Sequence, residues 1–380
     1  MSTFKISIIV PTYHCVERIN DVISCLQQQT IGFQSLEILL SDDGSFDGTA
    51  QKNVAFSAQY ANVFSLQLPR NSGFAGAPRN AALHAATAPY VMFLDSDDSL
   101  PPDACALLYD EIERTKTDMA FGYCRRVSQN GTVIQEIPPA YANIPAHIST
   151  LPDELERELI MRDSFFCRIY KRDIIADHAL SFPERTPGED LYFLYSYLLQ
   201  CKSVSFIAAP VYDYFTNEMS VTHNRTAFYY TQLGHCYEAM QQLFADAGQS
   251  AHFPTIIDHI LEFHLRGMLA SSCMDEDSIA GALPAWEWLF RFEQQNNLIA
   301  TSPLAFTIIH LVSQKDWTSC AKLMLTCAPL ARALETAHEK TQQAFAEAEK
   351  WRQHAAELQR TIEAMRNSRS WRITHFFRKR

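Results

Sequence analysis

Closely spaced cysteine pairs are missing from this sequence. Its ten cysteines include no CxxC pair and no zinc-finger spacing. Most of them lie in apolar or helical surroundings, which favours buried free thiols of a reducing compartment over disulfides or cysteine-bound metal.

Long apolar runs are also absent. No stretch approaches the roughly 20 apolar residues that a helix needs to cross a bilayer. The N-terminal residues enter a strand pattern at once and have none of the features of a signal peptide. We therefore expect a cytoplasmic protein, at most peripheral on the inner face of the cell membrane.

The chain as a whole has no excess of positive charge, since its formal net charge is −11. This balance argues against general nucleic-acid binding. The average hides one asymmetry, because residues 366–380 contain six Arg or Lys and no Asp or Glu.

What is present is a chain of 380 residues, 47% hydrophobic and 20% charged, with room for two domains and a large core. Strand-length apolar runs alternate with helical patterns over the first ~100 residues, which predicts an α/β fold of βαβ units on a mostly parallel sheet. The expected strands are 5–10, which Pro11 should end, 36–40, 63–68 and 91–94.

The most informative stretch is Val91 to Asp98, where four apolar residues run into a cluster of carboxylates. Ligands of open α/β sheets bind just beyond the carboxyl ends of such buried strands. On extended backbone, Asp95 and Asp97 would project on the same face. A pair of carboxylates suits a hard divalent cation, Mg²⁺ or Mn²⁺. The alternative is a helix N-cap in which the acids stabilise the next helix.

A second acidic loop, residues 42–49, also follows a predicted strand and should open on the same edge of the sheet. A carboxylate there could accept a hydrogen bond from a base N–H, such as N3 of uracil, while the glycines permit tight turns. A well-made turn before a helix would explain the same residues.

These two motifs occur together, and in order, with Ser7 to Tyr13 and with Ala77 to Asn80. The set resembles the nucleotide-sugar half of family 2 glycosyltransferases, which have the GT-A fold, over roughly residues 4 to 225. The resemblance implies metal-dependent, inverting transfer of a sugar from a UDP-sugar to a glycan or lipid-linked acceptor in surface polysaccharide synthesis. It implies Mn²⁺ or Mg²⁺ as the cofactor and a domain covering residues 1–225.

The resemblance also implies roles for individual residues. Asp43 would bind the nucleobase, Asp97 would be a direct metal ligand, and Arg79 would close over the nucleotide, unless it is an ordinary surface charge. The residues implied in nucleotide-sugar binding are Pro11, Thr12, Tyr13, Asp43, Arg79, Asp95 and Ser96. His223 could complete the metal site or touch the diphosphate, or be a surface residue.

The catalytic base implied by the resemblance is Asp190, which stands with Glu189 at the start of a predicted helix. Inverting transfer needs one carboxylate to take the proton from the acceptor hydroxyl as that hydroxyl attacks the anomeric carbon. Helix capping is the alternative reading of these acids, and Glu189 in particular could serve it. At Arg168 and Ile169 the chain departs from the Asn-Lys expected of the family.

The C-terminal part has three predicted segments. Residues 226–329 have helical patterns and are expected to form a second domain packed on the first. Apolar and alanine positions in residues 330–365 are spaced alternately by four and three, which predicts a heptad helix that pairs subunits or docks on its own chain. In residues 366–380 aromatic side chains lie among the six cations, as in an anchor for anionic lipid or a solvated basic terminus.

Two other functions fit parts of the sequence. A sugar-phosphate nucleotidylyltransferase has a related fold but should carry a Gly-rich, basic loop after its first strand, where this chain has Pro11 to His14. A catalytically silent membrane scaffold would have lost some of the expected acids, and none is missing.

Overall fold

The computed structural model describes residues 4–128, 131–137, 147–148, 165–215, 225–256, 264, 267–268, 274–295, 311, 314–326 and 329. His223 and the predicted heptad and basic segments, residues 330–365 and 366–380, lie outside these residues. None of the described helices is both long enough and apolar enough to cross a membrane. The described cysteines are free thiols and, except for Cys25, they are buried.

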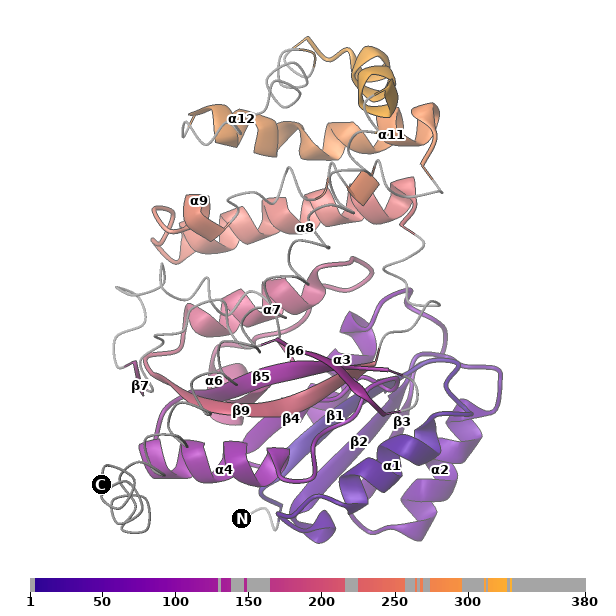
Figure 1. Cartoon of the computed structure of the whole chain (residues 1–380), viewed down its shortest axis with the longest axis vertical. Helices are drawn as coiled ribbons and strands as arrows, with labels where there is room; N and C mark the ends of the chain where they lie inside the picture. Colours follow the sequence, from indigo (N-terminus) through magenta and orange to yellow (C-terminus); the bar gives the residue numbers. More distant parts are fainter. Residues whose placement is uncertain are drawn as a thin grey trace, which may run out of the picture.

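A mixed nine-stranded sheet forms the centre of the molecule (Figure 1). Its order is β3-β2-β1-β4-β8-β5-β9-β7, with β6 paired to β5. The strands are β1 (Ile6–Thr12), β2 (Leu36–Asp42), β3 (Val63–Gln67), β4 (Tyr90–Phe93), β5 (Met119–Val127), β6 (Val133–Ile137), β7 (His147–Ile148), β8 (Arg168–Lys171) and β9 (Val204–Phe215).

The parallel half of the sheet agrees with the prediction. β1 pairs in parallel with β2 and β4, and β2 with β3. Every residue of β1, β2 and β4 is buried, because helices cover both faces of the sheet. The carboxyl ends of β1, β2 and β4 therefore meet at one edge.

The expectation that Pro11 ends the first strand is wrong, because β1 continues to Thr12. Leu94 donates to the Ile9 carbonyl, so Ile9 faces β4, and Pro11 faces the same side two residues later. β4 has already ended at Phe93. No ladder hydrogen bond is required of Pro11 there, and its missing N–H costs nothing.

Two sets of helices cover the sheet (Figure 1). α1, α2 and α4 lie on one face, while α3, α6 and α7 lie on the other, with α8 and then α11 and α12 stacked beyond α7. The helices are α1 (Ile19–Gln27), α2 (Thr49–Gln59), α3 (Gly76–Ala85), α4 (Ala104–Thr115), α6 (Arg172–Asp177), α7 (Glu189–Leu198), α8 (Ala227–Asp246), α9 (Phe253–Ile256), α11 (Glu276–Ala282) and α12 (Glu287–Gln295), with 3₁₀ turns η1 (Phe33–Ser35) and η4 (Leu283–Trp286).

The larger hydrophobic core runs without a break from the sheet through α7 into the later helices. Phe93 of β4, Phe193 of α7, Tyr230 of α8 and Trp286 of η4 belong to this one cluster and are fully buried. The indole Nε1 of Trp286 donates to the carbonyl of Tyr230 at 3.0 Å.

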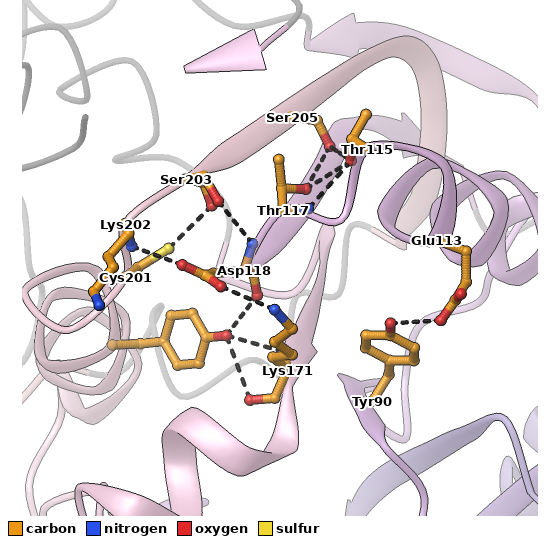
Figure 2. Close-up of polar contacts among 11 residues, drawn as sticks. Tyr90, Glu113, Thr115, Thr117, Asp118, Lys171, Cys201, Lys202, Ser203 and Ser205 are labelled. Atoms are coloured by element: carbon orange, nitrogen blue, oxygen red, sulfur yellow. Dashed lines mark hydrogen bonds and ion pairs between the residues drawn. The ribbon is translucent and has the colours of Figure 1, made fainter. Parts of the chain in front are cut away.

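Polar contacts brace the opposite edge of the sheet, where β4 and β5 begin (Figure 2). Asp118 accepts hydrogen bonds from Lys171 Nζ at 3.0 Å and from the Lys202 backbone at 2.8 Å. The buried Tyr197 hydroxyl donates to the Asp118 carbonyl at 2.6 Å and accepts from the Lys171 N–H at 2.9 Å. These bonds tie α7 to β5 and β8, far from the carboxyl ends of β1, β2 and β4.

Candidate active site

Three loops and the start of α7 meet at the carboxyl edge of the parallel strands, where the sequence predicts a site. The loops after β1 and β2 are joined by backbone hydrogen bonds, including Asp43 N–H to the Thr12 carbonyl at 2.9 Å. The loop after β4 carries Asp95 to Asp98, and α7 begins beside it at Glu189.

The acidic residues after β4 form a turn, so the argument from alternation on extended backbone is wrong. The strand ends at Phe93, and the Asp98 N–H donates to the Asp95 carbonyl at 3.1 Å. Asp95 forms an ion pair with Arg79 at 2.7 Å, whereas Asp97 lies 3.9 Å from Arg18. The two carboxylates thus meet different guanidinium groups.

Arg79 is a deeply buried cation of the site, with a side chain only 5% exposed. One guanidinium nitrogen bonds Asp95 at 2.7 Å and the other bonds Glu189 at 3.0 Å. The group also lies 5.0 Å from the centre of the Phe165 ring. Burial favours the neutral form of Arg79, but the two carboxylates outweigh it and raise its pKa. The surface-charge alternative is therefore wrong: Arg79 is a buried link between the β4 turn and α7.

Both acids at the start of α7 are perturbed by their surroundings. Burial, with repulsion from Asp190, raises the pKa of Glu189, although the charge of Arg79 opposes this rise. Burial also raises the pKa of Asp190, although the charge of Arg79 opposes this rise. The alternative reading, in which Glu189 caps the helix, is wrong, because the N-cap residue of α7 is Gly188, whose φ is +80°. This left-handed backbone conformation favours glycine.

Asp43 lies almost fully buried in the loop after β2. Its carboxylate accepts hydrogen bonds from the Ser72 N–H at 3.0 Å and the Ser72 hydroxyl at 2.9 Å. Burial raises the pKa of Asp43, and the bonds from Ser72 oppose that rise. Gly44 permits the close approach of this loop to residues 70–71, because a Cβ at Gly44 would lie 2.6 Å from their backbone.

The end of β1 presents only one of its three predicted binding residues to solvent. Pro11 and Thr12 are buried, and Asn53 donates to the Thr12 hydroxyl at 2.9 Å. Tyr13 is 43% exposed and stacks on the His14 ring at 4.0 Å.

Sequence reasoning missed two buried side chains beneath the turn, Asp98 and Tyr212. Burial, with repulsion from Asp97 and Asp95, raises the pKa of Asp98 to about 8. The Tyr212 hydroxyl donates to Asp98 at 2.8 Å. Asp98 belongs to the acidic cluster that the sequence shows after residue 94, and Tyr212 belongs to a Tyr-Asp-Tyr sequence at residues 212–214. No pattern in the sequence indicates that these two side chains are partners.

The oxygen atoms at this edge suit a hard divalent cation. In the described part of the chain no three His, Cys, Asp or Glu side chains form a complete metal cluster. Mg²⁺ and Mn²⁺ need only one or two protein carboxylates when phosphate oxygens and water supply the rest. Asp97 and Asp95 fit that requirement, and Ser96 lies between them in the chain.

Comparison with known proteins adds an independent finding. Residues 7–178 match the family model described as glycosyl transferase family 2. A poly(ribitol-phosphate) beta-glucosyltransferase of Bacillus spizizenii is 28% identical over 213 residues, 56% of this chain and 32% of that protein. The putative glycosyltransferase EpsH of Bacillus subtilis is 30% identical over 224 residues, 56% of this chain and 61% of EpsH. The chain thus spans less than two thirds of either relative.

Solved structures give the fold. The structure of Staphylococcus aureus TarS residues 1–349 in complex with UDP-GlcNAc superposes with a TM-score of 0.67 at 22% identity, covering 84% of this chain and 90% of TarS 1–349. The mixed sheet with its parallel half therefore has the GT-A arrangement that the sequence predicted.

Proposed function

We propose that the chain is a glycosyltransferase that transfers a sugar from a UDP-sugar to a hydroxyl of a surface glycan or a lipid-linked acceptor, with inversion. The proposal starts from the match of residues 7–178 to the model of glycosyl transferase family 2. The observation that carries the proposal is the buried bridge through Arg79. It joins Asp95 of the β4 turn to Glu189, the chain neighbour of Asp190. The proposed base therefore lies beside the proposed donor site.

The donor is assigned from the site and the relatives. TarS has been crystallised with UDP and with UDP-GlcNAc, which supports a UDP-sugar. In this chain Asp43 would accept the base N–H, with Tyr13 as the exposed ring at the end of β1. The names of the relatives, among them the poly(ribitol-phosphate) beta-N-acetylglucosaminyltransferase TarP of Staphylococcus aureus (26% identical over 249 residues, 62% of this chain and 72% of TarP), support a cell-wall polymer as the acceptor class.

In the proposed reaction, Asp190 takes the proton from the acceptor hydroxyl while that oxygen bonds to the anomeric carbon and the diphosphate leaves. A divalent cation held by Asp97 and Asp95 would stabilise the negative charge that forms on the leaving diphosphate. The raised pKa of Asp190 makes it a stronger base than an exposed aspartate. The positive charge of Arg79 opposes this rise in pKa and favours the ionised form of Asp190.

The test is UDP release from a panel of UDP-sugars, with and without Mn²⁺. Wild type should release UDP from at least one of them. Asp97→Asn should lose the Mn²⁺-dependent part of UDP binding, whereas Asp190→Asn should keep UDP affinity and lose about 10²–10⁴-fold in rate.

Each rival function predicts a different result in the same assay. A scaffold would release no UDP from wild type with any sugar in the panel. A nucleotidylyltransferase would instead release pyrophosphate from UTP and a sugar phosphate.

A further inference from the structure

Asp98 and Tyr212 form a buried hydrogen-bond network directly beneath the acidic turn. One carboxylate oxygen of Asp98 accepts from the Tyr212 hydroxyl at 2.8 Å, and the other accepts from the Phe215 N–H at 2.9 Å. The Tyr212 hydroxyl also accepts from the N–H of Asp95 at 3.2 Å. This one hydroxyl therefore contacts both ends of the turn.

The strand that carries Tyr212 is itself firmly held. Asp213 exchanges two backbone hydrogen bonds with Ser99, at 2.9 and 3.1 Å, immediately after the turn. Its carboxylate forms a bidentate ion pair with Arg125 of β5, at 2.7 and 2.8 Å. The end of β9 is thus a fixed support against which the turn is placed.

We propose that Tyr212 and Asp98 are positioning residues of the donor site. They hold the backbone of residues 95–98 in place. As a result, the Asp95 and Asp97 carboxylates face a divalent cation and the diphosphate that this cation binds. Partners of metal-binding side chains orient those side chains and affect metal affinity. This inference rests on the proposed function, because it assumes that UDP binds with a cation. It assigns a role to two residues that are too deeply buried to contact the donor.

The competing explanation is that the network only stabilises the fold. Tyr197 provides a matched control, because it is as buried as Tyr212 and its hydroxyl also accepts from one backbone N–H. That hydroxyl donates to the Asp118 carbonyl at 2.6 Å, with the Lys171 carbonyl at 3.4 Å as a more distant second acceptor. Its hydroxyl bonds Asp118 and Lys171, where β5 begins and β8 ends, at the edge of the sheet opposite the acidic turn. Tyr197→Phe and Tyr212→Phe remove the same atom from similar surroundings.

The experiment measures UDP affinity of the full chain by calorimetry, with Mn²⁺ and with a chelator, in wild type and in both variants. Melting temperatures report any loss of stability. We expect Tyr212→Phe to lose about tenfold or more of the Mn²⁺-dependent gain in UDP affinity. Its affinity in chelator should stay within about twofold of wild type. Tyr197→Phe should keep the wild-type gain in UDP affinity with Mn²⁺, even if its melting temperature falls by as much as that of Tyr212→Phe.

Three outcomes would overturn the inference. If Tyr212→Phe keeps the full Mn²⁺-dependent gain, the network is structural only and the proposed glycosyltransferase function is unaffected. If both variants lose the gain equally, the effect is general destabilisation. If UDP affinity of wild type does not respond to Mn²⁺, the metal-dependent part of the proposed function fails, and the positioning role fails with it. Asp98→Asn serves as a second variant should Tyr212→Phe not fold.

Discussion

At the scale of single residues, Arg79 determines how the site is arranged. A cation that is only 5% exposed needs partners, and Arg79 has two carboxylates, Asp95 from the β4 turn and Glu189 from the distant helix α7. Removing one member of a buried ion pair typically costs about 3–5 kcal/mol, because the other charge is left without compensation. Arg79 therefore contributes to the stability of the folded protein, and it also favours the ionised form of the proposed base, Asp190.

Arg79→Met should shift the pH dependence of sugar transfer. Asp190 must be ionised to act as a base, so activity appears as the pH rises through its pKa. Burial raises that pKa and the positive charge of Arg79 lowers it. Without this charge, the pKa rises further and the acid limb of the kcat/KM profile moves to higher pH.

Arg79→Lys is the control for this prediction, because it keeps the positive charge at the same position. Its acid limb should remain closer to that of wild type than the limb of Arg79→Met. An unshifted limb in Arg79→Met would contradict the assignment of Asp190 as the base.

At the scale of elements, α3 holds the segment that leads into α7. Asn80 donates to the Phe182 carbonyl at 2.9 Å and accepts from the Phe182 N–H at 2.8 Å. Gly76 lies against the next residue, since a Cβ placed on it would be 2.4 Å from the Pro183 carbonyl oxygen. Together with Arg79, these contacts place the start of α7.

Gly76→Ala should therefore destabilise the protein by about 1–3 kcal/mol, the usual cost of overpacking. The backbone of Pro183 cannot rotate away as a side chain could. Chemical denaturation of the two proteins would measure the difference.

Gly281→Ala, in α11, is the matched control. A Cβ at Gly281 meets no atom within 4 Å. Alanine there should stabilise the helix by up to about 1 kcal/mol. A Gly76→Ala protein that is as stable as wild type would mean that α3 can move away from Pro183 at little cost.

At the scale of the whole molecule, the sheet and the later helices share one core. The cluster that contains Phe93 also contains Tyr230, Trp286 and Leu289, all fully buried. Because these residues contribute to the same buried volume, the described helices after residue 226 should unfold together with the sheet.

Trp286→Ala should lower the free energy of unfolding by about 3–5 kcal/mol, as is typical for a large buried ring. It would also remove the hydrogen bond to the Tyr230 carbonyl. Circular dichroism and the release of bound UDP should report the same, lowered midpoint. Two separate transitions would contradict the shared core.

Deleting residues 330–380 tests the proposed roles of the heptad and basic segments. We expect UDP release in solution to persist. Self-association should fall because the predicted heptad segment is removed. Binding to vesicles of anionic lipid should fall because the six cations of residues 366–380 are removed, and each basic residue contributes about 1 kcal/mol near such a surface. Sedimentation with and without vesicles would measure both effects. Unchanged sedimentation would contradict these roles.

The order of strands and helices in the first half of the chain, and the acids that follow β2 and β4, could be predicted from the sequence. Strands buried on both faces need nearly continuous apolar runs, so the clusters of polar residues follow the ends of the strands. These requirements act on neighbouring residues, so they can be recognised as patterns in the sequence.

The partners of those acids were decided only by the tertiary structure. Arg79 and Glu189 are 110 positions apart, and Asp98 and Tyr212 are 114 apart. A buried charge or hydroxyl must find a partner wherever the packed chain places one, and no local pattern records which residue that is. The predicted elements brought the acids to one edge of the sheet, while the burial of Arg79 and Tyr212 determined how those acids are held.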